Sequence, residues 1–219
     1  MARETAPAGR VPLMAGNWKM NLDHLQAVAF VQKLAWTLKD ANHDFGAGGS
    51  EVAVFPPFTD LRSVQSLVSG DKLDVVFGAQ DVSEFDSGAY TGEISGAFLK
   101  ALECSYVIIG HSERRTMHGE TDEQLGRKVA AAIKHGLVPV LCVGETADDL
   151  EKHGPSAVPV AQLKAALAGR KLEELAGEKE LPVGVCLVAV LGEEVVDVLH
   201  EDDVAAGGRE VPEQGAVPG

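Results

Sequence analysis

The feature that most constrains the fold is a repeated alternation between short apolar runs and longer stretches with helical spacing. Six runs are predicted to be strands: 11–15, 51–55, 73–77, 106–109, 137–143 and 183–191. Strands that lack polar alternation are buried on both faces, which is typical of a parallel sheet covered by helices. We therefore expect the 219 residues to form an α/β protein with one main domain, either a barrel or a doubly wound sheet.

The segments between these runs carry apolar residues three or four positions apart, which is the period of a helix with one buried face. The spacing predicts helices after residue 21 and over 59–68, 121–135 and 160–175. The helix over 121–135 has the clearest boundaries. Thr121 and Gln124 match a capping box at its start, and Gly136 is a suitable stop at its end.

Charge and cysteine usage argue against several classes of function. A formal net charge of −14 disfavours nucleic acid and anionic membranes as partners, because phosphate binding needs clustered Lys and Arg. The cysteines are far apart and lie in or beside apolar runs, so we expect them to be reduced and buried: Cys104, Cys142 and Cys186. No signal peptide or membrane-spanning run is recognised, so a cytoplasmic location is expected.

The composition changes from Arg170 onwards. This part has no Ser, Thr, Asn, Ile, Met or aromatic residue, and it carries twelve acidic side chains against four basic ones. We expect the α/β domain to cover 11–191, and we expect 192–219 to be a flexible acidic tail that contains Gly and Pro.

Polar residues that follow the apolar runs are the first candidates for a site, because ligands of parallel α/β folds bind at the carboxyl ends of the strands. Asn17 and Lys19 follow the first run in G-N-W-K-M-N. In an extended segment they point the same way while Trp18 points into packing, and an amide with an ammonium suits an anionic or oxygen-rich ligand. The alternative is a surface lysine beside a turn asparagine.

A second group follows the fourth run, in Y-V-I-I-G-H-S-E-R-R. If Ser112 caps a short helix, the imidazole of His111 lies at the positive end of that helix and stays neutral, able to donate a hydrogen bond to a substrate oxygen. Glu113 can pair with Lys19 or with either following arginine. The alternative is a histidine satisfied at a helix start, next to a surface ion-pair cluster.

A third group lies in P-V-L-C-V-G-E-T, over 139–146. Cys142 is expected to pack rather than to act as a nucleophile, because no local cation would lower the pKa of its thiol. Glu145 is a candidate for bracing the neighbouring loops.

Together with A-Q-D-V-S-E-F-D-S-G-A-Y-T-G-E-I-S, these three segments resemble the triosephosphate isomerase family, in its order and at its spacing, over about 12–167. The resemblance implies an incomplete (β/α)8 TIM barrel, with about six β/α units matched and strands seven and eight not recognisable. It also implies interconversion of glyceraldehyde 3-phosphate and dihydroxyacetone phosphate through an enediolate, without metal or organic cofactor. A neutral histidine at a helix N-terminus is already the established pattern for this enzyme.

The same resemblance assigns roles to individual residues. Asn17 and Lys19 would bind the triose phosphate, and Lys19, His111 and Glu113 would be catalytic. The loop over 79–95 would enter the partner subunit of a homodimer, with Thr91 approaching the partner's site.

The sequence departs from the family in its last part. It has no Y-E-P-V-W-A-I-G-T-G segment, which carries the base and begins the lid, and it lacks the later phosphate loops. The general base is therefore unknown. Glu193 or Glu194 could stand near the base position and Gly207-Gly208 could imitate a phosphate loop, but a solvated acidic face and a flexible tail explain them more simply. The alternative function is a catalytically inactive, truncated or frame-altered family member that at most binds phosphate ligands.

Overall fold

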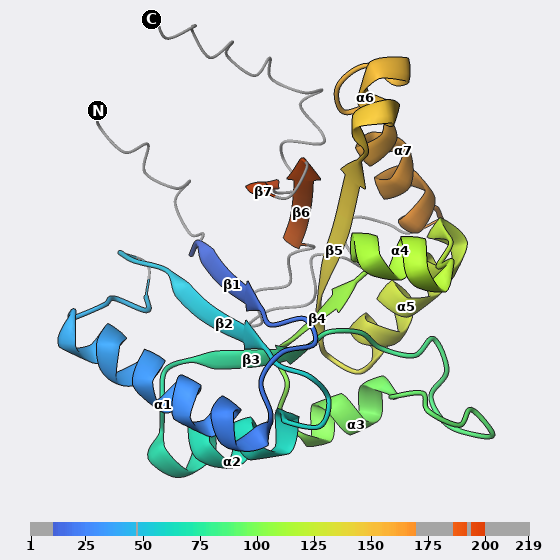
Figure 1. Cartoon of the computed structure of the whole chain (residues 1–219). Coiled ribbons are helices and arrows are strands. Elements are labelled where there is room, and N and C mark those ends of the chain that lie inside the picture. The colour runs from blue at the N-terminus through green and yellow to red at the C-terminus, as the bar shows by residue number, and fades with distance from the viewer. Residues whose placement is uncertain (1–10, 47, 170–185, 192–193, 200–219) are drawn as a thin grey trace, which may run out of the picture.

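The computed structural model describes residues 11–46, 48–169, 186–191 and 194–199, the last two ranges by their backbone. They contain one curled sheet whose strand order follows the order along the chain (Figure 1). The strands are β1 (Leu13–Asn17), β2 (Glu51–Phe55), β3 (Val76–Ala79), β4 (Tyr106–Ile109), β5 (Val138–Glu145), β6 (Cys186–Leu191) and β7 (Glu194–Leu199). Neighbours from β1 to β6 pair in parallel, and β7 is antiparallel to β6. The expected α/β architecture, an incomplete barrel, is confirmed.

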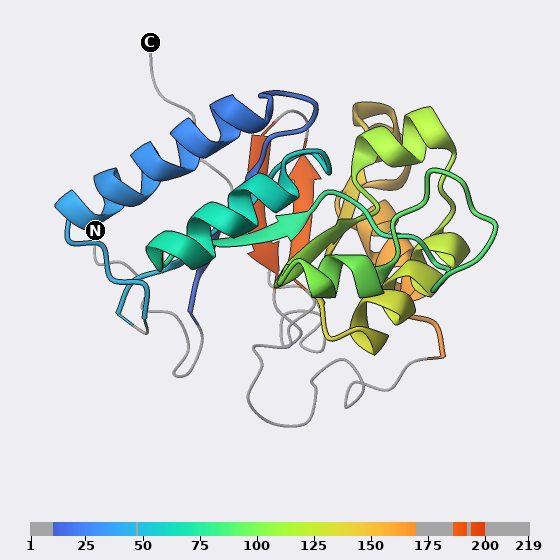
Figure 2. The same ribbon diagram turned by 90° about the horizontal axis from the view of Figure 1, so that it is seen from below.

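Helices follow each of the first five strands and lie along the outer side of the curled sheet (Figures 1 and 2). They are α1 (His24–Asp40), α2 (Leu61–Asp71), α3 (Gly96–Ala101), α4 (Ser112–His118), α5 (Asp122–Lys134), α6 (Ala147–His153) and α7 (Ala157–Ala166). The short helix α4 begins directly after β4, so the residues between β4 and α4 are held from both sides.

The buried side chains form two clusters, one on each face of the sheet. Along β4, Val107 and Ile109 belong to the cluster between the sheet and the helices, whereas Tyr106 and Ile108 belong to the cluster on the inner face. Along β2, Phe55 also lies on the inner face. This alternation follows from the two-residue period of a strand. It explains why these strands have no polar positions, as a sheet covered on both faces requires.

The first strand is an exception to the burial that the sequence predicts. It runs over Leu13–Asn17 rather than 11–15, and Met14 is 61% exposed. Among the described residues β1 pairs only with β2, so it forms an edge of the sheet. The prediction of a buried strand is wrong here because burial on both faces depends on neighbours that the curled sheet does not provide on this side.

Several element boundaries also differ from the predictions. The third strand is Val76–Ala79 rather than 73–77, and the helix predicted over 160–175 is α7, Ala157–Ala166. Gly169 has a φ of +77°, a left-handed conformation that favours glycine and follows the end of that helix. Residues 170–175 lie outside the described residues.

The helix predicted over 121–135 is α5, and its capping box is only half formed. The side chain of Thr121 accepts from the backbone N–H of Gln124, as predicted. The Gln124 side chain instead donates from Nε2 to Glu84 at 3.2 Å, so a contact with the loop after β3 replaces the return bond of the box.

The strand β7 lies inside the segment that the composition predicts to be a tail. Its sequence, E-V-V-D-V-L, is rich in valine, and Gly192-Glu193 separates it from another valine-rich run. Two such runs joined by a pair that begins with glycine form a hairpin signal that the composition obscured. Glu193 and Gly207-Gly208 lie outside the described residues.

Cys104 and Cys142 are buried and carry reduced thiols, as expected. Burial raises the pKa of the Cys104 thiol to about 12. Cys186 is the first residue of β6, and its side chain lies outside the described part. No helix in the described ranges is both long and apolar enough to cross a membrane.

Candidate active site

The polar residues singled out in the sequence gather at one end of the parallel sheet. Asn17 is the last residue of β1, and Lys19 follows two positions later. His111 comes two residues after the end of β4. Since β1 to β4 are all parallel, these positions belong to the carboxyl end of the sheet, where ligands of such folds bind.

The loop after β1 is not the extended segment that the sequence predicts. Lys19 has a φ of +52°, which is left-handed, and its backbone N–H donates to Oδ1 of Asn17 at 3.0 Å. The alternation argument for Asn17 and Lys19 is therefore wrong, because an Asn side chain that binds the backbone two residues later makes a turn. Trp18 packs as expected, edge to face on Phe30, with ring centroids 5.3 Å apart.

His111 occupies the N-cap position of α4 itself. Its Nδ1 accepts a hydrogen bond from the backbone N–H of Glu113 at 3.2 Å. Ser112 is the first helical residue and not the cap, so that prediction is wrong: the imidazole fills the acceptor position that a serine hydroxyl would have taken. A ring that accepts at Nδ1 carries its proton on Nε2 when neutral. In the described part of the chain, Nε2 has no hydrogen-bond partner.

The protonation state of His111 follows from its surroundings. Its side chain is 17% exposed, and burial lowers the pKa of the imidazole below its usual value. The Glu113 carboxylate acts in the opposite direction, and the Lys19 ammonium adds to the lowering. The lowered pKa keeps His111 neutral at neutral pH, so the ring can donate one hydrogen bond without carrying charge.

Lys19 and Glu113 connect the loop after β1 to α4. Lys19 Nζ lies 2.8 Å from Oε1 of Glu113, and Oε2 of Glu113 lies 3.5 Å from Nδ1 of His111. The hydrogen bond from Lys19 lowers the pKa of Glu113, so this carboxylate is ionised and a weak base. Of the pairings that the sequence left open for Glu113, the structure has the one with Lys19. Lys19, His111 and Glu113 are thus brought together.

The two arginines after Glu113 make structural contacts that support the site. Arg115 donates to the carbonyls of Gly110 and Cys142, at 2.9 and 3.2 Å, and it forms an ion pair with Asp122. Gly110 has a φ of +74°, and a Cβ at this position would lie 2.8 Å from Leu125 Cδ1. Only glycine fits both the conformation and the space, so the turn that presents His111 depends on it.

Arg114 belongs to a buried ionic cluster that sequence reasoning missed. Lys128 of α5 is 3% exposed and contacts Asp81 at 2.7 Å and Glu120 at 2.6 Å, and Arg114 contacts the same two carboxylates. Burial alone would raise the pKa of Glu120, but Lys128 and Arg114 together lower it. The signal in the sequence was the polar pair Gln80-Asp81, which follows the third apolar run as the other candidates follow theirs.

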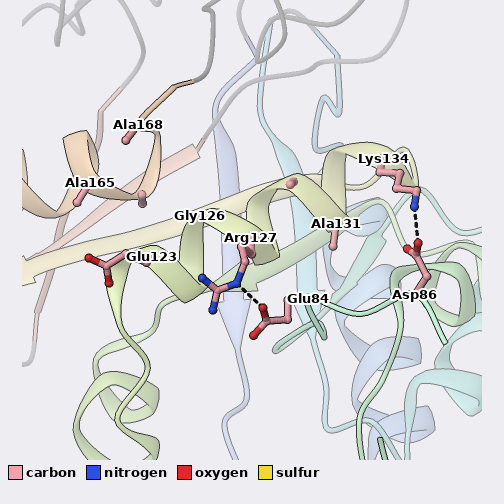
Figure 3. A pocket seen from close by; sticks show the side chains of 11 residues that line it. Glu84, Asp86, Glu123, Gly126, Arg127, Ala131, Lys134, Ala165 and Ala168 are labelled. Carbon is pink, nitrogen blue, oxygen red and sulfur yellow. Dashed lines mark hydrogen bonds and ion pairs between the residues drawn. The ribbon is translucent and has the colours of Figure 1, made fainter. Parts of the chain in front are cut away.

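Residues 80–95, which connect β3 to α3 and are called the arm below, are fastened to α5 by further charged pairs. Figure 3 shows Arg127 of α5 directed at Glu84, and Lys134 directed at Asp86. They line a pocket of about 520 Å³, whose other walls are mostly alanines of α5 and α7. None of the site residues lines this pocket. Thr91, near the end of the arm, is exposed.

Glu145 ends β5 and contacts the connection between α6 and α7. Its Oε1 accepts from the backbone N–H of Ser156 at 3.3 Å, which agrees with the bracing role predicted for it. Cys142 is buried in the inner cluster, as predicted for a packing residue. Among the described residues, no group of His, Cys, Asp and Glu is arranged to hold a metal ion.

The curled parallel sheet, its outer helices and the polar residues at its carboxyl end define a (β/α)-barrel protein with a histidine and a lysine at the usual place of the active site. A comparison with known families identifies which barrel this is. The family model described as triosephosphate isomerase matches residues 12–181, and the chain belongs to that family.

Individual relatives agree with this result. The chain is 76% identical over 160 residues to triosephosphate isomerase of Leifsonia xyli subsp. xyli, which covers 73% of this chain and 61% of the relative. It is 55% identical over 166 residues to that of Mycobacterium bovis (strain BCG / Pasteur 1173P2), covering 76% and 62%. The crystal structure of triosephosphate isomerase from Bartonella henselae superposes with a TM-score of 0.65 at 31% identity, over 81% of this chain and 66% of that chain. The chain spans about three fifths of the length of the curated relatives.

Proposed function

We propose that this chain is a triosephosphate isomerase that interconverts glyceraldehyde 3-phosphate and dihydroxyacetone phosphate. The observation that carries the proposal is the arrangement of His111, whose Nδ1 is occupied by the N–H of Glu113 and whose Nε2 is left to donate. The paired Lys19 and Glu113 lie beside it. Family membership supports the choice of substrate.

The residues have complementary roles in this reaction. The Nε2–H of His111 donates to the carbonyl oxygen of the substrate and, as an enediolate forms, to the oxygen on which negative charge develops. The ammonium of Lys19 stabilises the same charge and, with Asn17, binds the substrate. Glu113 is the acceptor that directs Lys19, since their atoms are 2.8 Å apart. None of these roles requires a cofactor.

The group that removes the proton α to the carbonyl is not assigned. Glu113 is unsuited to this role because its ion pair with Lys19 lowers the pKa of its carboxyl group. Glu194 is the first residue of β7, next to the end of β6, and is the candidate that the described backbone offers. It remains a candidate to be tested, and the base itself stays unassigned.

A second candidate function is binding of phosphate-bearing ligands without turnover. It is favoured by one observation: the family's base-bearing segment, Y-E-P-V-W-A-I-G-T-G, is absent from the sequence. In this case Asn17, Lys19 and His111 would hold a triose phosphate, but no proton transfer would follow.

An isomerase assay on the purified chain separates the two candidates. We expect His111→Gln to lower turnover by roughly 100- to 1000-fold, as for the loss of a donor to a developing oxyanion. His118→Gln, which changes an exposed histidine of the same helix, is the matched control and should keep full activity. Turnover that persists in His111→Gln would refute the proposed role. Absence of turnover in the unaltered chain, combined with a higher melting temperature in the presence of a triose phosphate analogue, would support the binding function instead.

The candidate base, Glu194, has its own test. Glu194→Gln should abolish turnover if this carboxylate removes the proton, whereas unchanged turnover would exclude it. We also propose, from family membership, that the protein is cytoplasmic and forms a homodimer through the arm, with Thr91 near the partner's site. Sedimentation of the purified chain, compared with a variant whose arm tip is shortened, tests the dimer.

A further inference from the structure

Gln80 links three strands at the carboxyl end of the sheet. It directly follows β3, and its Nε2 donates to the carbonyl of Phe55, at the end of β2, at 2.8 Å. The same nitrogen donates to the carbonyl of Lys19, in the loop after β1, at 2.7 Å. A primary amide has two N–H groups on one nitrogen, so both donors of Gln80 are used. The Phe55 carbonyl also accepts from the backbone N–H of Trp18 at 3.1 Å.

These contacts hold the backbone of Lys19 from both sides. Its N–H donates to Asn17 Oδ1 at 3.0 Å, and its carbonyl accepts from Gln80. Between these two bonds the residue has a φ of +52°, a conformation that a lysine adopts only when its surroundings impose it. Gln80 therefore supplies one of the two bonds that impose it.

The direction of the Lys19 side chain depends on this backbone. The Lys19 side chain is 53% exposed and its ammonium sits on a flexible four-carbon stem, so it would otherwise sample many positions in solvent. Among the described residues its one ion-pair partner is Glu113, at 2.8 Å, and that carboxylate lies beside His111. A change in the backbone at Lys19 would move the ammonium away from both.

We propose that Gln80 is a positioning residue for the active site: by binding the carbonyl of Lys19, it directs the Lys19 ammonium to Glu113 and His111. This role depends on the proposed function only in so far as Lys19 and His111 are the side chains that act on the substrate. It requires an amide at position 80, because neither a carboxylate nor a thioether can donate two hydrogen bonds.

The alternative is that Gln80 only joins the strands. Both roles predict a loss of stability when the amide is removed, so stability cannot separate them. They differ at His111, which Gln80 does not contact. If Gln80 directs Lys19, its removal takes a positive charge away from the imidazole and leaves the Glu113 carboxylate unpaired. Both changes favour the protonated ring, since Lys19 lowers the pKa of His111 and Glu113 raises it.

The test is an NMR titration of the His111 ring, with its signal assigned by its loss in His111→Gln. Gln80→Met keeps the size of the side chain and removes both donors, and we expect the pKa of His111 to rise towards the value in Lys19→Gln. Adding Gln80→Met to Lys19→Gln should cause no further rise, because both changes remove the same interaction. Gln124→Met, which changes a glutamine of α5, is the matched control and should leave the titration unchanged.

An unchanged pKa of His111 in Gln80→Met, together with a raised value in Lys19→Gln, would overturn the proposal and leave Gln80 as a joining residue. Gln80→Asn keeps the amide but shortens its reach, and it is the variant to use if Gln80→Met does not fold. We expect a smaller rise of the His111 pKa for it, and no rise would count equally against the proposal.

The titration needs no turnover. An inactive chain that shows the expected rise would refute the isomerase function alone, whereas an active chain without the rise would refute only the role of Gln80.

Discussion

The turn that presents His111 depends on one glycine. Gly110 has a φ of +74°, and a Cβ placed there would lie 2.8 Å from Leu125 Cδ1, whereas Gly119, at the other end of α4, has a φ of +66° and open space around it. We expect Gly119→Ala to cost about 1–2 kcal/mol of unfolding free energy through its left-handed backbone. Gly110→Ala should cost a further ~1–3 kcal/mol, because Leu125 must also move.

Urea denaturation of the two variants measures this difference. Because both changes add one methyl group at a left-handed position, their difference measures the crowding around Gly110, where Leu125 Cδ1 would lie at 2.8 Å and Arg115 Nη2 and the Cys142 carbonyl at 3.3 Å. Equal losses of stability would show that the packing around Gly110 yields to a methyl group without cost.

A second expectation at this scale concerns pH. Burial lowers the pKa of His111 in the folded chain below the unfolded value of about 6.5, so the unfolded chain binds the proton first as the pH falls. The contribution of this ring to stability is therefore complete above about pH 6.5 and decreases as the pH falls towards its folded pKa. Between about pH 7.5 and about pH 5.5, the unfolding free energy should fall more steeply for the wild type than for His111→Gln. Parallel slopes for the two proteins would contradict the lowered pKa.

The sequence predicted which residues of the site lie together better than it predicted their geometry. That Lys19, His111 and Glu113 belong together could be inferred from their places after strands. The left-handed backbone of Lys19 could not be inferred in this way. The hydrogen bonds to its N–H and carbonyl come from Asn17 and from Gln80, which is 61 residues away. Such long-range contacts leave no periodic pattern in the sequence.

Among the elements, α5 holds the arm, residues 80–95, in place through ion pairs. Lys128 at its centre is buried among Asp81, Glu120 and Arg114, while Lys134 at its end forms an exposed pair with Asp86. Removing one member of a buried ionic group leaves a charge without compensation. We therefore expect Lys128→Met to lower the unfolding free energy by about 3–5 kcal/mol.

Lys134→Met is the matched control, because it makes the same change on the same helix at a side chain that is 61% exposed. Its effect should stay within about 1 kcal/mol, as is usual for surface ion pairs. Thermal or urea unfolding of both variants provides the measurement. Similar effects of the two changes would mean that water reaches the cluster around Lys128.

The strands and the longer helices were largely predictable, whereas the short helices α3 and α6 were not predicted. The other errors lie at element ends and in the last part of the chain. Apolar runs and helical spacing located β2, β4 and α5 to within one or two residues. The helix predicted over 160–175 was placed too far along the chain, and β7 was missed because its acidic residues suggested a tail. For β7, composition was given more weight than the local order of residues.

For the whole molecule, the feature with the clearest consequence for association with other chains is the sheet edge formed by β1. Met14 is 61% exposed there, and β1 has one described neighbour. Exposed sheet edges pair with other chains, and a lysine on the edge is a common protection against this. We expect Met14→Lys to reduce concentration-dependent association of the chain, as measured by sedimentation velocity.

Met117→Lys makes the same change at a methionine of α4 that is 76% exposed and far from the edge in sequence. It should leave the association as in the wild type. If both substitutions reduce association equally, net charge and not the edge controls it.

The strand order of the sheet repeats the order of synthesis. The strand β1 is synthesised first, then β2, and each later strand pairs with the strand that precedes it in the chain. Each new strand therefore pairs with one that was made before it, and the sheet can be extended at a single edge as domains begin to fold during synthesis.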